Sequence, residues 1–132
     1  MAARFDDALR GYAYPVHRRD GFKCVYCGLD GSTDFSAWLS LSWDHLLPNG
    51  DPRRDDHEFI VTACLFCNVA ENQYFARARE RGISFDGKTR AELVSQRLPY
   101  VAKTRSAYRA FWDERVRRSE RAPQPTDTEP AS

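Results

Sequence analysis

The sequence has no long hydrophobic run. Among its 132 residues, no apolar stretch approaches the ~18 residues that a helix needs to span a bilayer, so we predict no membrane segment. The N-terminal stretch, MAARFDDALR, contains acidic side chains and no extended apolar segment, which argues against a secretory signal peptide. Together these absences predict a cytoplasmic protein.

Net charge is also nearly absent, because the sequence has 20 basic and 19 acidic residues, which gives a net charge of +1 at pH 7. The distribution of charge is uneven, however. Residues 1–67 contain seven basic and ten acidic side chains, whereas residues 68–121 contain 13 basic and seven acidic ones. A basic C-terminal half is typical of a surface that binds a polyanion, although solvated helices are often basic as well.

The chain is long enough for one domain with a single modest core. We predict this domain over residues 1–121, with its central part at about 23–82 and a helical extension at 89–120. The final stretch, 122–132, is rich in proline, threonine and small residues and lacks large apolar groups, so we predict a disordered tail.

The hydrophobic patterns predict an α+β fold in which strand, loop, strand and helix follow one another. We expect strands at 39–45 and 59–63, joined by a polar loop at 48–56. The predicted helices cover 5–12, 68–82 and a segment that opens with a capping box at 89–92.

The last of these helices is rich in aromatic residues, and Pro99 starts or kinks it. Its apolar side chains recur at roughly helical spacing and are Val101, Tyr108, Phe111, Trp112 and Val116. Such a stripe belongs more often to a core than to an interface with a partner. We therefore predict that these side chains are buried.

Only four cysteines are present, and they form two Cys-x-x-Cys pairs: Cys24 with Cys27 and Cys64 with Cys67. Such a turn directs two sulfur atoms at one point, and two turns supply the four ligands of a tetrahedral zinc ion. Disulfides are disfavoured in a cytosolic chain, and a redox motif would be single and next to a βαβ unit. We therefore predict structural Zn²⁺, and the chemistry must come from other residues.

Between the two pairs lies the stretch LSWDHLLP, in which Asp44 and His45 are adjacent within an apolar strand. Burying an acid and a base is costly unless both have partners. Neighbouring strand residues point to opposite faces, so one can bind a cation while the other faces water. Both residues could instead be satisfied members of the core.

The order of these motifs resembles that of the HNH endonucleases, the ββα-metal nucleases that carry two zinc knuckles. The shared pattern is Cys-x-x-Cys-Gly, an apolar-Asp-His-apolar-apolar-Pro strand, a glycine-containing loop, a second apolar strand, and Cys-x-x-Cys-Asn. These elements occur in this order from Lys23 to about Asn72, which is 50 of the 132 residues. The resemblance implies a small ββα-metal core with flanking helices.

The resemblance also implies a function, the metal-dependent hydrolysis of phosphodiester bonds in DNA. It implies that His45 is the general base and that Asp44 and Asn68 hold a divalent cation such as Mg²⁺. An imidazole that titrates near neutrality suits the first role, and an amide oxygen suits the second. Asn68 could also cap the helix that follows it.

Two positions depart from the family pattern. Phe59 stands where the family has an asparagine that orients the general base, so His57, Asn49, Asp55 or a backbone carbonyl is left for that task. Glu71 stands where a basic residue often follows the last cysteine. These departures favour one alternative, a catalytically weak or inactive zinc-stabilised module that binds nucleic acid. A second alternative is a zinc domain whose aromatic-rich C-terminal helix binds a protein partner.

Basic residues near the predicted site are candidate contacts for phosphate groups: Arg53, Arg54, Arg77 and Arg81. Each of them alone is more often a solvated side chain. We predict both His17 and His57 at the surface, although His57 lies close enough in the loop region to be a second candidate for the site. The sequence does not determine the oligomeric state.

Overall fold

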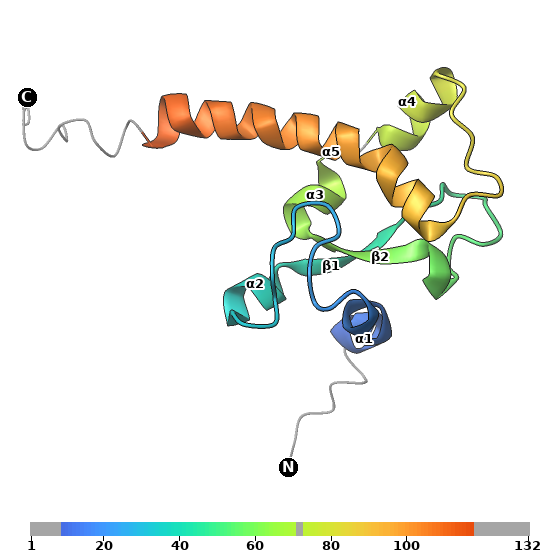
Figure 1. The fold of residues 1–132 in the computed structure, drawn as a ribbon, viewed down its shortest axis with the longest axis horizontal. Coiled ribbons are helices and arrows are strands. Elements are labelled where there is room, and N and C mark those ends of the chain that lie inside the picture. Colours follow the sequence, from blue (N-terminus) through green and yellow to red (C-terminus); the bar gives the residue numbers. More distant parts are fainter. Residues whose placement is uncertain (1–8, 71–72, 118–132) are drawn as a thin grey trace, which may run out of the picture.

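Figure 1 shows the computed structural model, which describes residues 9–70 and 73–117. A two-stranded antiparallel sheet lies among helices, so the predicted α+β class is confirmed. The elements in chain order are α1 (Leu9–Arg19), α2 (Phe35–Leu39), β1 (Leu41–His45), the 3₁₀ turn η2 (His57–Phe59), β2 (Ile60–Cys64), α3 (Leu65–Val69), α4 (Tyr74–Glu80), α5 (Arg90–Phe111) and the π-helical turn η3 (Trp112–Val116).

The sheet pairs β1 with β2 so that Leu41 lies opposite Cys64 and His45 lies opposite Ile60. All five residues of β2 are buried, as its β-branched and apolar composition predicts. In β1 only Leu41 and Asp44 are buried, and the other three residues are partly exposed. β2 therefore lies in the interior, and β1 brings polar side chains to the border of the core.

Helices cover both faces of the sheet (Figure 1). On one face, α5 packs through Leu93 against Val61 and through Val101 against Ala63. On the other face, α1 contacts both strands, and the His17 Nδ1 atom lies 2.7 Å from the Thr62 hydroxyl. The prediction of a surface position for His17 is therefore wrong, because this helix packs its ring into the core.

Two predicted helices have different limits in the structure. The helix expected at 68–82 is divided, since α3 ends at Val69 and α4 begins at Tyr74. Gly82, with φ +72°, follows the end of α4 as predicted. The helix expected at 5–12 begins at Leu9 in the described part and continues through Pro15 to the end of α1. Residues 1–8 and the tail predicted at 122–132 lie outside the described residues.

α5 has 22 residues and begins with the predicted capping box. The Thr89 side chain accepts from the Glu92 amide, and the Glu92 carboxylate accepts from the Thr89 amide. Pro99 lies inside the helix, which bends in its first half (Figure 1). The helix then leaves the body, and we call residues 102–117 the arm. Neither α5 nor another helix of the described segments combines the length and hydrophobicity needed to cross a membrane.

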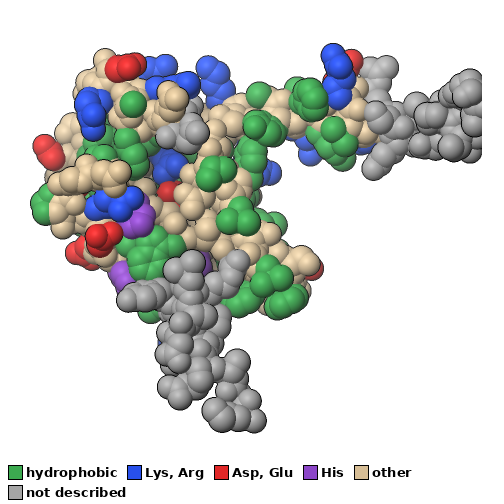
Figure 2. Space-filling view, turned by 180° about the vertical axis from the view of Figure 1, so that it is seen from behind, with side chains coloured by type: hydrophobic (Ala, Val, Ile, Leu, Met, Phe, Trp, Pro, Cys, Tyr) green, Lys and Arg blue, Asp and Glu red, His purple; other side chains and the backbone are tan. Residues whose placement is uncertain are grey.

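The aromatic side chains of the arm are exposed, so the prediction of their burial is wrong. Tyr108, Phe111 and Trp112 expose 64%, 61% and 39% of their surface. Val101 is buried because the sheet lies beneath it, but the same helix face continues past the edge of the body. Figure 2, in which the arm extends to the upper right, shows hydrophobic and basic side chains interspersed along it.

Candidate functional site

The four cysteines meet where the first Cys-x-x-Cys turn lies against the junction of β2 and α3. Gly28, with φ +78°, closes the turn that holds Cys24 and Cys27, and Cys64 caps α3 by accepting from the Cys67 amide. Their sulfur atoms all lie within 4.8 Å of one another. The predicted grouping of four potential metal ligands is thus confirmed.

The sulfur spacing also distinguishes between a metal site and a disulfide. Cys27 Sγ lies 3.8 Å from Cys64 Sγ, whereas a disulfide bond is about 2.05 Å long. Two ligands of a tetrahedral ion with metal–sulfur bonds of about 2.3 Å lie about 3.8 Å apart. Hydrogen bonds from Cys64 and Cys67 lower the pKa of the Cys24 thiol, and the same contacts raise the pKa values of Cys64 and Cys67, so without an ion the first proton leaves from Cys24. The four residues therefore fit a tetrathiolate metal site.

Arg105, which sequence reasoning missed, places a cation beside this cluster. Its Nη1 atom lies 4.0 Å from Cys67 Sγ, and its guanidinium lies 5.7 Å from the centre of the Phe66 ring. A divalent ion with four thiolates carries a net charge of −2, which a nearby guanidinium stabilises. α5 therefore contacts the cysteine cluster through charge as well as through packing.

Asp44 lies on the face of β1 that packs against α5. Its side chain is 4% exposed and pairs with Arg97, whose side chain is 5% exposed. Both carboxylate oxygens accept from Arg97 Nη1, at 2.9 and 3.1 Å. Burial raises the pKa of Asp44 to about 6, and the guanidinium acts against this rise. The carboxyl group is therefore mostly ionised at pH 7, with a cation of the same chain as its partner.

Arg97 joins Asp44 to α3, because its Nη2 atom donates to the Asn68 backbone carbonyl at 3.1 Å. Three aromatic rings lie within 6.0 Å of its guanidinium: those of Tyr26, Tyr74 and Phe75. Sequence reasoning did not single out this residue. A signal was present, since Arg97 stands four residues from both Leu93 and Val101, in the middle of a buried helix stripe.

Asn68 lies on the same side of β1 as Asp44. Its Nδ2 atom donates to Ser42 Oγ at 2.9 Å and to the Trp43 carbonyl at 3.2 Å. The amide hydrogens thus fasten α3 to β1, and the side-chain oxygen is the atom suited to a cation. Asn68 is not the cap of α3, because it lies inside this helix and Cys64 provides the cap.

His45 lies on the opposite face of β1, at the end of the strand. Its side chain is 25% exposed, and its Nε2 atom lies 3.3 Å from both Trp43 Nε1 and Asp55 Oδ1. A neutral Nε2 accepts from the indole, whereas a protonated Nε2 donates to the carboxylate. Burial lowers the pKa of His45, and Arg54 adds to this effect while Asp55 opposes it. The imidazole is therefore mostly neutral at pH 7 and can accept a proton.

The surroundings of His45 explain how Phe59 is accommodated. The Phe59 carbonyl accepts from the Leu46 amide at 2.9 Å, which holds the end of β1 next to η2. Of the residues that sequence reasoning left to orient the imidazole, Asp55 contacts it directly. His57 is exposed and lies on the same face, where its ring meets Trp43 edge to face with ring centres 5.2 Å apart.

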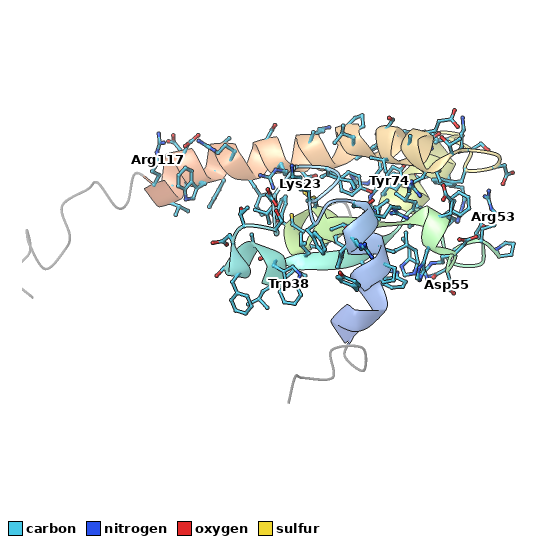
Figure 3. All side chains as sticks on the ribbon, turned by 60° about the horizontal axis from the view of Figure 1, so that its bottom comes forward. Lys23, Trp38, Arg53, Asp55, Tyr74 and Arg117 are labelled. Atoms are coloured by element: carbon cyan, nitrogen blue, oxygen red, sulfur yellow. The ribbon has the colours of Figure 1, made fainter. Side chains whose placement is uncertain are left out.

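The four candidate arginines divide into two groups. In the loop before η2, Arg54 Nη1 lies 3.7 Å from Asp55 Oδ1, and the Arg53 guanidinium lies 5.0 Å from the centre of the Phe59 ring. Figure 3 shows Arg53 and Asp55 at one end of the molecule, with Arg117 at the other. Arg77 is exposed on α4, and Arg81 follows the end of this helix and donates to the Tyr100 hydroxyl. Of the four, Arg54 is the one whose charge acts on His45.

β1 thus separates two chemical environments. One face carries Asp44 with Asn68 and Arg97, and the other carries His45 with Asp55. The chain matches no family model, and no curated protein or solved structure is significantly similar to it. The functional interpretation therefore rests on the site geometry and the sequence motifs.

Proposed function

We propose that this chain is an endonuclease of the HNH type that hydrolyses phosphodiester bonds of DNA with the help of a divalent cation. The observation that carries the proposal is the chemistry of the two faces of β1. A mostly neutral imidazole lies at the end of the strand, and a carboxylate beside a helix amide lies on the reverse. Hydrolysis of a phosphodiester needs a base for water and a cation for the phosphate oxygens.

In this proposal the four cysteines bind structural Zn²⁺. The sulfur spacing of 3.8 Å supports this assignment, because it agrees with tetrahedral zinc–thiolate geometry. The ion joins the first Cys-x-x-Cys turn to the junction of β2 and α3, and so keeps α3 beside β1. Four thiolates leave no open coordination position, so this ion takes no part in hydrolysis.

His45 acts as the general base, with Nε2 as the atom that takes a proton from water. The lowered pKa supports this role, because a neutral imidazole is the form that accepts a proton. The new N–H then faces Asp55, which stabilises the imidazolium from 3.3 Å. Because Asp55 contacts the same nitrogen that takes the proton, the attacking water must enter between Nε2 and this carboxylate, and Asp55 stabilises the imidazolium without replacing the asparagine that the family has at the position of Phe59.

Asp44 and Asn68 are the protein ligands of the divalent cation, Mg²⁺ or a similar ion. When bound, this ion supplies positive charge to the phosphate oxygens. Arg97 Nη1 now occupies both oxygens of Asp44, so the donor set fits the ion only after the guanidinium has released the carboxylate. Arg97 is therefore a competing cation. Because the ion and His45 lie on opposite faces of β1, the scissile phosphate must bind around the end of this strand; Arg53 and Arg54 in the loop before η2 are its proposed contacts, and Arg77 and Arg81 contact the DNA elsewhere.

The test is a nicking assay with supercoiled plasmid and Mg²⁺ or Mn²⁺. We expect nicked circles that EDTA abolishes, and a loss of at least about 100-fold in rate for His45→Ala, the lower range for a general base. His57→Ala is the comparison, because this exposed histidine lies on the same face and packs on Trp43; a loss confined to His45→Ala assigns the base to His45. Equal rates for wild type and His45→Ala would refute the proposed base.

The Asp44–Arg97 pair favours a second function, a zinc-stabilised module that binds nucleic acid without cutting it. A carboxylate that remains bound to a guanidinium cannot hold a divalent cation. This function predicts that the protein retards plasmid migration but produces no nicks with either cation, and that His45→Ala leaves the retardation unchanged. The same gels therefore decide between the two functions.

A further inference from the structure

The arm presents aromatic rings that stay exposed in the described part of the chain. Tyr108 packs edge to face on Phe66, with ring centres 4.9 Å apart, yet stays largely exposed. Phe111 is similarly exposed, and Val116 continues the apolar face to the end of η3. Large apolar side chains that gather on one exposed surface usually mark a binding site.

Basic side chains surround these rings. The guanidinium groups of Arg109 and Arg117 lie 5.1 and 5.4 Å from the centre of the Trp112 ring. Asp113 holds both arginines, with contacts of 3.4 and 3.6 Å, so the ring and the two cations form one ordered unit. From residue 102 to residue 117 the arm carries five basic and two acidic side chains.

We propose that the arm binds single-stranded nucleic acid. Phe111 and Tyr108 stack on unpaired bases, and Arg109 and Arg117, which lie against the Trp112 ring, contact the adjoining phosphates. Alternating aromatic rings and cations suit a strand whose bases are accessible, because each base offers a flat π face and each phosphate a negative charge. The double helix hides its base faces and leaves the rings without a partner.

The net positive charge of the arm favours a nucleic-acid partner over a second copy of the chain. Two arms that packed together would bring two net positive surfaces into contact, whereas a polyanion neutralises the excess. The arm also lies far from the loop that carries Arg53 and Asp55 (Figure 3). It is thus a separate contact that can hold a strand while the His45 face engages another part of the same molecule. This inference rests on the proposed nucleic-acid partner but not on its cleavage.

The test measures fluorescence anisotropy of a labelled 30-nucleotide oligothymidylate in buffer without divalent cations, using the full zinc-loaded chain. Phe111→Ala and Tyr108→Ala should each weaken binding by about fivefold or more, the lower range for loss of one stacked base. The pair Arg109→Gln and Arg117→Gln should lower the slope of log affinity against log salt by about 1.4, since each phosphate contact on a single strand contributes about 0.7. Phe35→Ala is the control, because this aromatic side chain on α2 is 72% exposed and lies outside the arm.

The proposal is overturned if the arm variants bind the oligonucleotide within about twofold of wild type. It is also overturned if sedimentation shows a dimer that Trp112→Ala converts to a monomer while binding is unchanged, because the arm then joins two copies. A duplex of equal length should depend little on Phe111. If plasmid is never nicked but the arm variants still lose affinity, the endonuclease proposal is refuted and the arm proposal is supported. If plasmid is nicked but the arm variants bind as wild type does, the arm proposal is refuted and the endonuclease proposal is supported.

Discussion

Replacing Arg97 by methionine removes the partner of a buried acid and leaves a side chain of similar length. Asp44 then remains 4% exposed without a cation. Breaking a buried ion pair on one side costs about 3–5 kcal/mol, which is a large part of the ~5–15 kcal/mol that stabilises a typical domain. At pH 8 we therefore expect the free energy of unfolding to fall by this amount.

The loss should depend on pH, and its sign follows from the pKa of Asp44. Its value of about 6 in the folded state lies above the ordinary 3.8, so the folded state holds the proton more tightly than the unfolded chain does. Wild-type stability therefore decreases by about 3 kcal/mol through this group as pH rises from below 4 to above 6. Without Arg97 the pKa rises further, so the variant suffers most at pH 8. At pH 5 the neutral acid leaves a loss of about 1–3 kcal/mol.

Urea unfolding at pH 5 and pH 8, with Zn²⁺ present, measures both values. Arg90→Met is the matched control, since Arg90 lies on the same helix and pairs at 3.0 Å with Glu58 at the exposed surface; we expect less than about 1 kcal/mol and little pH dependence. Asp44→Asn combined with Arg97→Met should recover much of the loss. Equal losses at both pH values, or no recovery in the double variant, would refute the buried-charge explanation.

Three further predictions concern the cysteine cluster and its surroundings. Cys67→Ser should abolish the binding of one equivalent of Zn²⁺ and lower the thermal midpoint, whereas Ser42→Ala should keep the metal content. Mass spectrometry under native conditions measures the metal content of both variants. Full occupancy in Cys67→Ser would contradict a four-sulfur site. Arg105→Gln should release Zn²⁺ to a chromogenic chelator several-fold faster at low salt, because the contact of 4.0 Å between the guanidinium and Cys67 Sγ is lost. Lys103 is exposed, and Lys103→Gln should leave the release rate unchanged. Identical rates for the two variants would exclude the electrostatic role. Gly31→Ala should destabilise the fold by about 1–3 kcal/mol in urea unfolding, because its Cβ would lie 2.7 Å from Leu41 Cδ1 and 2.9 Å from the Trp38 Cα; an unchanged midpoint would show that the backbone shifts to make room for it.

Local signals predicted much of the fold. The paired cysteines, the two apolar strands and the capping box at Thr89 are short patterns whose physics acts within a few residues, and all appear in the structure. The grouping of the thiols required one inference beyond local sequence, that two identical turns share one ion. These features therefore needed no knowledge of the tertiary arrangement.

The partner of Asp44 and the exposure of the arm could not be derived in the same way. Arg97 lies 53 residues from Asp44, and only the packing of α5 on the sheet brings them together. Helical spacing correctly indicated that Tyr108 and Trp112 share a face with Val101. It contained no information on where the body beneath that face ends, so burial was inferred where the structure shows exposure.

Cys64 is at once the last residue of β2, the cap of α3 and one of the four clustered thiols. If the cluster loads Zn²⁺, strand ending and helix start depend on the same atom that binds the ion, and the yield of folded protein becomes a function of metal supply. A newly made chain would compete with other thiolate proteins for the ion before its hairpin is fixed. Scarcity of zinc would then lower the amount of folded protein.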